Sequence, residues 1–151
     1  MLELKDLHKT FNPGTVNEKK AITDLSLHLN KGEFVTVIGS NGAGKSTILK
    51  TVSGLMHPRT GTITFCDQNI THTEAYKLLR TGLAHVPEGR RVFAELSVLQ
   101  NLKLGAYTRN DKNEMEATLK EIYVRFPRLE ERKNQMAGTL SGGEQQMLAM
   151  G

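Results

Sequence analysis

The sequence predicts a mixed α/β fold, and three observations lead to this prediction. Short segments with strand-like alternation recur through the first 95 residues of the 151-residue chain. An apolar run over residues 34–38 leads directly into a glycine-rich loop, which a helical pattern follows. Later apolar residues recur at helical spacing, so we expect an α/β part over residues 1–95 and a helical part over residues 96–151.

Two strands are expected near the start of the chain. Leucines alternate with charged residues over residues 2–7, and they alternate with polar residues over residues 25–29. The sequence Asn12-Pro13-Gly14 predicts a turn, and residues 16–20 are typical of an exposed loop. Residues 34–38 are almost continuously apolar, which indicates a strand covered on both faces.

The remaining elements follow from periodicity and from start and stop signals. They are, in chain order, a helix over residues 48–52, a strand over 62–65, a helix over 73–80, a buried strand over 83–86, a helix capped by Ser97, a helix over 115–126 and a helix beginning at Ser141.

Composition fits a globular domain and excludes several classes of protein. The chain is 38% hydrophobic and 24% charged, and its one cysteine, Cys66, allows no internal disulfide framework. No apolar run reaches the roughly 18 residues that span a membrane, and no signal peptide is expected. The formal net charge of +4 does not by itself separate a nucleic-acid binder from a nucleotide binder.

Residues 39–47 read GSNGAGKST and match the P-loop, a loop that cradles phosphates between a strand and a helix. Glycines let successive backbone N–H groups converge on phosphate oxygens, and the helix that follows presents its positive end. Lys45 is expected to reach the β- and γ-phosphates and is a candidate catalytic cation, while the Ser46 hydroxyl is a candidate Mg²⁺ ligand. The predicted nucleotide-binding residues of this loop are Gly39, Ser40, Asn41, Gly42, Ala43, Gly44, Lys45, Ser46 and Thr47.

A second motif lies near the end of the chain, where residues 140–146 read LSGGEQQ. Ser141 and Glu144 have the spacing of a capping box at the start of a helix. Gly142 and Gly143 would leave the first N–H groups of this helix open to an anion. Taken alone, the motif favours a well-capped helix, and beside an upstream P-loop it favours an anion site.

The two motifs together resemble those of the nucleotide-binding subunits of ABC transporters. The resemblance implies a P-loop NTPase core of the ABC ATPase type, with an N-terminal antiparallel β segment and a helical subdomain. It also implies a head-to-tail dimer in which the signature motif of one subunit caps the γ-phosphate of ATP on the other. In this sequence the signature residues would be Leu140, Ser141, Gly142, Gly143, Glu144 and Gln145.

Within that family, residues 84–93 and 139–150 are similar to the branched-chain amino acid importers. Residues 10–20 look more like other amino-acid-type importers. The resemblance implies ATP and Mg²⁺ as cofactors, with hydrolysis coupled to amino acid transport. It implies transmembrane permease subunits and a second nucleotide-binding subunit as partners, no nucleic acid, and a cytoplasmic location on the inner face of the cell membrane.

Two further site residues follow only from the resemblance. Phe11 stands where an aromatic side chain stacks on adenine, and the alternative is that it packs beside a turn. Glu88 stands where most of the family has a glutamine that contacts Mg²⁺. It is therefore a candidate metal ligand and catalytic carboxylate, and the alternative is a solvated loop residue.

The family pattern continues with an apolar strand that ends in a metal-binding Asp and a catalytic Glu. No apolar run followed by Asp-Glu occurs in this sequence. We therefore expect the first part of a longer subunit, an incomplete sheet, and a chain that is inactive as an ATPase alone. The alternatives are a module that binds nucleotide or a partner without hydrolysis, and a soluble ABC-type ATPase. A P-loop kinase would leave residues 140–145 unexplained.

Overall fold

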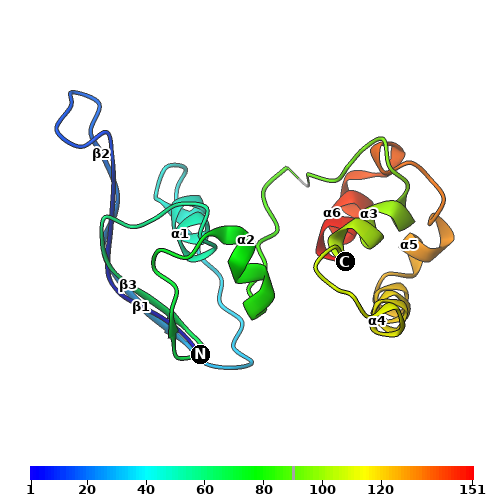
Figure 1. The fold of residues 1–151 in the computed structure, drawn as a ribbon. Helices are drawn as coiled ribbons and strands as arrows, with labels where there is room; N and C mark the ends of the chain where they lie inside the picture. Colours follow the sequence, from blue (N-terminus) through cyan, green and yellow to red (C-terminus); the bar gives the residue numbers. More distant parts are fainter. Residues whose placement is uncertain (90) are drawn as a thin grey trace. The chain divides into compact units, whose positions relative to one another are not determined.

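The computed structural model describes residues 1–89 and 91–151, and the chain forms two compact units (Figure 1). The first unit comprises Met1–His85, and the second comprises Val86–Gly151. Strands and short helices make up the first unit, and helices make up the second. The sequence pattern predicted the boundary between residues 95 and 96, whereas the compact units divide between His85 and Val86.

The first unit is built on a four-stranded antiparallel sheet with the strand order β2-β1-β3-β4. Figure 1 labels its first three strands. The strands are β1 (Leu2–Phe11), β2 (Lys19–Leu29), β3 (Thr60–Phe65) and β4 (Gln68–Asn69). Three of them correspond to predicted strands, and β1 and β2 are both longer than predicted. In particular, Lys19 and Lys20 belong to β2, although the sequence pattern placed them in a loop.

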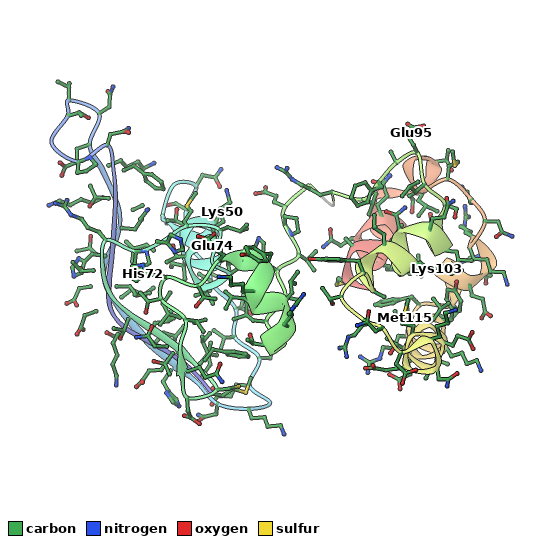
Figure 2. The ribbon with its side chains drawn as sticks, in the orientation of Figure 1. Lys50, His72, Glu74, Glu95, Lys103 and Met115 are labelled. Carbon is green, nitrogen blue, oxygen red and sulfur yellow. The ribbon has the colours of Figure 1, made fainter. Side chains whose placement is uncertain are left out.

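The core of the first unit lies between this sheet and its helices. The helices are α1 (Lys45–Val52), α2 (Ala75–Leu78) and the 3-10 turn η1 (Leu79–Thr81), so the helices predicted over residues 48–52 and 73–80 are confirmed. Glu74 directly precedes α2 (Figure 2). Its Oε1 lies 3.8 Å from His57 Nε2. The buried apolar side chains of this core are Leu4, Leu7, Ile22, Ile63, Ile70 and Leu78.

Two predicted strands are wrong, because residues 34–38 and 83–86 have no strand structure. The side chains of Phe34 and Ile38 are 93% and 86% exposed. An apolar run shows that a segment is suited to burial, but a strand also needs a neighbour that pairs with its backbone groups. No strand in the described part of the chain pairs with either segment.

The second unit is helical, as predicted. Its elements are α3 (Val98–Gly105), α4 (Lys112–Arg125), α5 (Pro127–Glu131), the 3-10 turn η2 (Ala137–Thr139) and α6 (Gly142–Met150). The predicted caps at Ser97 and Ser141 are confirmed. Its buried core consists of Val98, Leu102, Leu129, Ala137, Leu140 and Leu148. Among the described helices of the whole chain, none is long and apolar enough to cross a membrane.

Candidate functional site

The glycine-rich loop runs directly into α1 and leaves the start of this helix open. Gly44 is the N-cap residue, no side chain caps the first turn, and no acidic residue lies in that turn. Residues 39–43 are exposed. Because the first N–H groups of a helix have no partner within the helix, this end of α1 offers several donors and a positive dipole to an anion.

Strand β2 packs directly against this loop at Gly44. A Cβ atom built on Gly44 would lie 2.3 Å from the carbonyl oxygen of Ala21, and the φ angle of Gly44 is +91°. Both the left-handed backbone and the close approach therefore require glycine here. The contact fixes the loop against β2, an edge strand of the sheet.

Lys45 folds back over the loop that precedes it. Its Nζ donates hydrogen bonds to the carbonyl oxygens of Gly39 and Ser40, at 2.8 Å in both cases. Ser46 is exposed in the first turn of α1. An ammonium group, open N–H groups and a hydroxyl are the donor set that a Mg²⁺-bound polyphosphate requires. The residues present therefore fit such a group.

Phe11 lies at the end of β1, on the part of the sheet that borders the loop. Its partner across the β1–β2 pair is Lys19, and Lys19 Nζ lies 3.7 Å from the position of a Cβ on Gly42. Lys9 Nζ lies 5.7 Å from the centroid of the Phe11 ring. The sequence pattern did not place Lys19 beside the loop. A predicted strand that began before Ala21 would have included it.

The predicted capping box at the start of α6 is present in full. Ser141 N donates to Glu144 Oε2 at 2.9 Å, and Glu144 N donates to Ser141 Oγ at 3.4 Å. A Cβ built on Gly143 would meet nothing within 4 Å, so the surface of this first turn is open. Leu140 is buried in the core, and Gln145 Nε2 donates to the Ala137 carbonyl at 3.1 Å.

An ion pair that the sequence did not predict supports this capping box. Arg132 Nε lies 3.0 Å from Glu144 Oε1, and the Glu144 side chain is only 14% exposed. Hydrogen bonds with Ser141, and to a smaller extent the charges of Arg132 and Arg128, lower the pKa of Glu144 from its ordinary value. The carboxylate therefore remains ionised at neutral pH and holds the start of α6.

Glu88 lies exposed in a turn of the second unit, and the P-loop belongs to the first. Its predicted role beside Mg²⁺ therefore stays a prediction. Across residues 1–89 and 91–151, no group of three or more His, Cys, Asp or Glu side chains could hold a metal ion. Residue 90, in the stretch that resembles branched-chain importers, lies outside the described residues.

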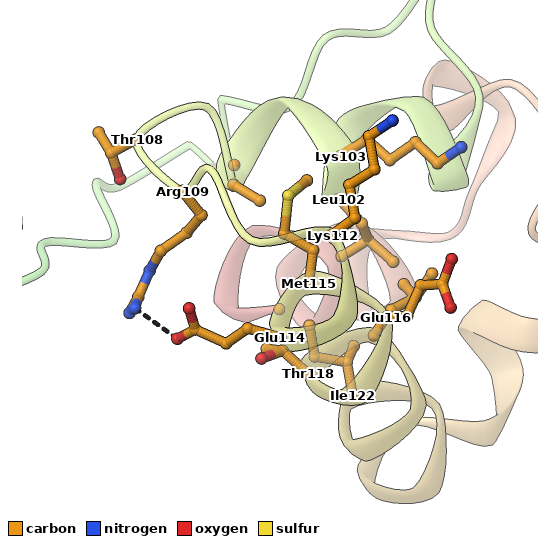
Figure 3. A pocket seen from close by; sticks show the side chains of 14 residues that line it. Leu102, Lys103, Thr108, Arg109, Lys112, Glu114, Met115, Glu116, Thr118 and Ile122 are labelled. Carbon is orange, nitrogen blue, oxygen red and sulfur yellow. Dashed lines mark hydrogen bonds and ion pairs between the residues drawn. The ribbon is translucent and has the colours of Figure 1, made fainter.

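A cavity of about 470 Å³ lies in the second unit, between α3 and α4 (Figure 3). Leu102, Met115 and Ile122 contribute apolar surface to it. Arg109 Nη1 donates to Glu114 Oε1 at 2.6 Å beside these side chains (Figure 3). No residue of the P-loop or of the signature motif lines this cavity, so it is not part of the candidate site.

A family model described as ABC transporter matches residues 22–151, a range that contains both motifs. This chain belongs to the ABC transporter family. The resemblance drawn from residues 39–47 and 140–145 is thereby confirmed.

Relatives of this ABC family member include ATP-binding proteins of importers. It is 45% identical over 132 residues to the high-affinity branched-chain amino acid transport ATP-binding protein BraG of Pseudomonas aeruginosa, covering 87% of this chain and 56% of the relative. It is 38% identical over 133 residues to the probable branched-chain amino acid transport ATP-binding protein LivF of Archaeoglobus fulgidus, covering 88% and 56%. The chain thus spans little more than half the length of these two relatives.

Solved structures of ABC cassettes share the fold. The dimeric structure of the MJ0796 ABC transporter cassette matches with a TM-score of 0.83 at 25% identity, covering 99% of this chain and 67% of that one. An ATP-binding subunit of an ABC transporter matches with a TM-score of 0.81 at 31% identity, covering 99% and 60%. The predicted fold class, an ABC-type ATPase cassette with mixed α/β structure, is confirmed.

Proposed function

We propose that this chain is the ATP-binding part of an ABC importer for amino acids, and that it binds Mg²⁺-ATP on residues 39–47. The observation that carries the proposal is the uncapped start of α1 with Lys45 folded over the loop. The names of the two branched-chain relatives support an amino acid importer.

Each residue of the loop has a role in this proposal. The N–H groups at the start of α1 hold phosphate oxygens, and Lys45 exchanges its carbonyl partners for the β- and γ-phosphates. The Ser46 hydroxyl would ligate Mg²⁺, and the metal would supply charge neutralisation for the phosphates. Phe11 offers its ring to the adenine base.

The proposed partners are a second copy of the cassette and transmembrane permease subunits. The first turn of α6 is sterically open at Gly143, and we propose that its backbone N–H groups contact the γ-phosphate of ATP bound to another copy, with Glu144 held aside by Ser141 and Arg132. The MJ0796 cassette, which shares this fold, is dimeric in its solved structure, and this supports a dimer here. We propose a location on the cytoplasmic face of the membrane, because importer ATP-binding subunits act there with their permeases.

Titration calorimetry with Mg²⁺-ATP tests the nucleotide site. We expect Lys45→Ala to weaken ATP binding by about tenfold or more, because charged hydrogen bonds contribute about 1.5–3 kcal/mol. Lys50→Ala is the matched control, since Lys50 lies exposed in the last turn of the same helix (Figure 2). Equal affinities of the two variants would contradict the proposed site.

Phosphate release from Mg²⁺-ATP tests the catalytic role proposed for Glu88. A general base typically contributes about 10²–10⁴-fold to a rate, so Glu88→Gln should lower any turnover to background. Turnover that this variant retains would contradict a catalytic role for Glu88. ATP binding with no turnover in the wild-type chain would agree with the expectation that the chain alone is inactive, and it would also contradict a catalytic role for Glu88.

A further inference from the structure

Lys19 brings a second ammonium group to the P-loop. Its Nζ lies 3.7 Å from the position of a Cβ on Gly42, within the loop that leads to α1. Lys45, the cation that the P-loop motif predicts, is the first residue of α1, whereas Lys19 belongs to β2. The loop therefore has one lysine on the helix that follows it and another on the strand beside it.

The backbone holds Lys19 in this position. The carbonyl of Ala21, two residues further along β2, is in close approach to Gly44. The β1–β2 pairing is irregular between the pairs Lys9–Ile22 and Thr10–Lys20, so Ala21 is an extra residue on β2 and lies at a bulge. Lys19 is also paired with Phe11 across the sheet. Pairing with β1 therefore holds the backbone of Lys19, two residues from the point where β2 approaches the loop.

The ammonium group of Lys19 is not neutralised by a neighbouring carboxylate. Across the part of the chain that the structure describes, no carboxylate forms an ion pair with Lys19. The adjacent carboxylate, Glu18, instead accepts a hydrogen bond from Gly14 N at 2.7 Å. An ammonium beside the positive end of α1 is favourable when an anion lies between them.

We propose that Lys19 is a second phosphate-binding cation, which contacts the polyphosphate of the nucleotide bound to the P-loop. This inference rests on the proposed nucleotide site and adds to it a residue from β2. Because Lys19 lies opposite Phe11, one segment of the sheet offers the ring for the base and the ammonium for the phosphates.

Affinities for ATP, ADP and adenosine, measured at low and high salt, test the proposal with Lys19→Gln. We expect ATP binding to weaken by about two- to fivefold at low salt, the range of an exposed ion pair. The effect should shrink at high salt, because exposed charges are screened, and adenosine binding should not change. Lys20→Gln is the matched control, since Lys20 is also exposed and the alternation of the strand turns it away.

Each outcome decides one question. If the wild-type chain binds no ATP, the proposed function fails and the role of Lys19 fails with it. If the wild-type chain binds ATP and Lys19→Gln has the same affinity, only the role of Lys19 is overturned. Equal weakening of ATP and adenosine binding would also overturn it, because a phosphate contact affects only the phosphorylated ligand. Lys19→Arg keeps the positive charge, so it should bind ATP as the wild type does, with the same dependence on salt. If Lys19→Gln acted only by disturbing the structure, Lys19→Arg would not be expected to keep this affinity.

Discussion

Gly44 and Gly82 share a φ angle of +91° but differ in their surroundings. A Cβ on Gly44 would lie 2.3 Å from the Ala21 carbonyl, whereas a Cβ on Gly82 would meet nothing within 4 Å. Both glycines belong to the first unit. Comparing alanine substitutions at the two glycines therefore separates the effect of backbone strain from the effect of close packing at the P-loop.

We expect Gly82→Ala to lower the free energy of unfolding by about 1–2 kcal/mol, which is the strain of a left-handed backbone. Gly44→Ala should lower it by about 1–3 kcal/mol more, because the methyl group overlaps a backbone atom of β2. It should also weaken ATP binding by displacing the loop. Urea unfolding of both variants measures the difference, and equal losses of stability would contradict the contact between β2 and the loop.

At the scale of elements, α3 and α6 begin with the same capping box but differ in charge. Ser97 N donates to Gln100 Oε1 at 2.8 Å in α3, and Ser141 N donates to Glu144 Oε2 at 2.9 Å in α6. Glutamine does not titrate, and the pKa of Glu144 is lowered by Ser141 and the nearby arginines. Of these two helix starts, only that of α6 should therefore become less stable in acid.

We expect Glu144 to stabilise the folded chain at neutral pH and to lose this effect in acid. Its pKa is lowered on folding, so its contribution is complete above the ordinary glutamate pKa and disappears as the pH falls through the lowered value. Urea unfolding of the wild type and of Glu144→Gln from pH 7 to pH 3 measures this contribution. Gln100→Ala is the control, because its effect on the free energy of unfolding should not change between pH 7 and pH 3. A constant difference between wild type and Glu144→Gln would contradict the prediction.

At the scale of the whole molecule, residues 34–38 present an apolar surface to solvent. Phe34, Val35, Val37 and Ile38 are between 40% and 93% exposed. Exposed apolar residues close together in the sequence, with backbone groups that pair with no described strand, favour association with another surface. The first unit therefore combines a well-packed antiparallel sheet with an uncovered apolar segment.

We expect this chain to self-associate through that segment. Sedimentation velocity should show association that rises with concentration and that falls in a Phe34→Ser, Ile38→Ser double variant. Val16→Ser is the control, because Val16 is fully exposed but lies in a separate loop of the β1–β2 hairpin. A monomeric wild type that unfolds cooperatively above about 60 °C, at the upper part of the usual range, would contradict this expectation.

Interactions between residues close in sequence could be predicted from the sequence. The capping boxes join residues three apart, and the P-loop occupies nine consecutive positions between an apolar run and a helix. Helical periodicity located α4, and leucine alternation located parts of β1 and β2. These signals were sufficient for the fold class and for both motifs, because each depends on local spacing.

Interactions between distant residues could not be predicted in this way. The apolar pattern of residues 34–38 predicted a strand, but strand formation depends on a partner elsewhere in the chain. The approach of Ala21 to Gly44, the place of Lys19 beside Gly42, and the ion pair between Arg132 and Glu144 all depend on packing between separate elements. Local spacing predicts which residues can form a helix, a strand or a loop. Which of these elements meet is decided by the burial and pairing that become possible when the chain folds.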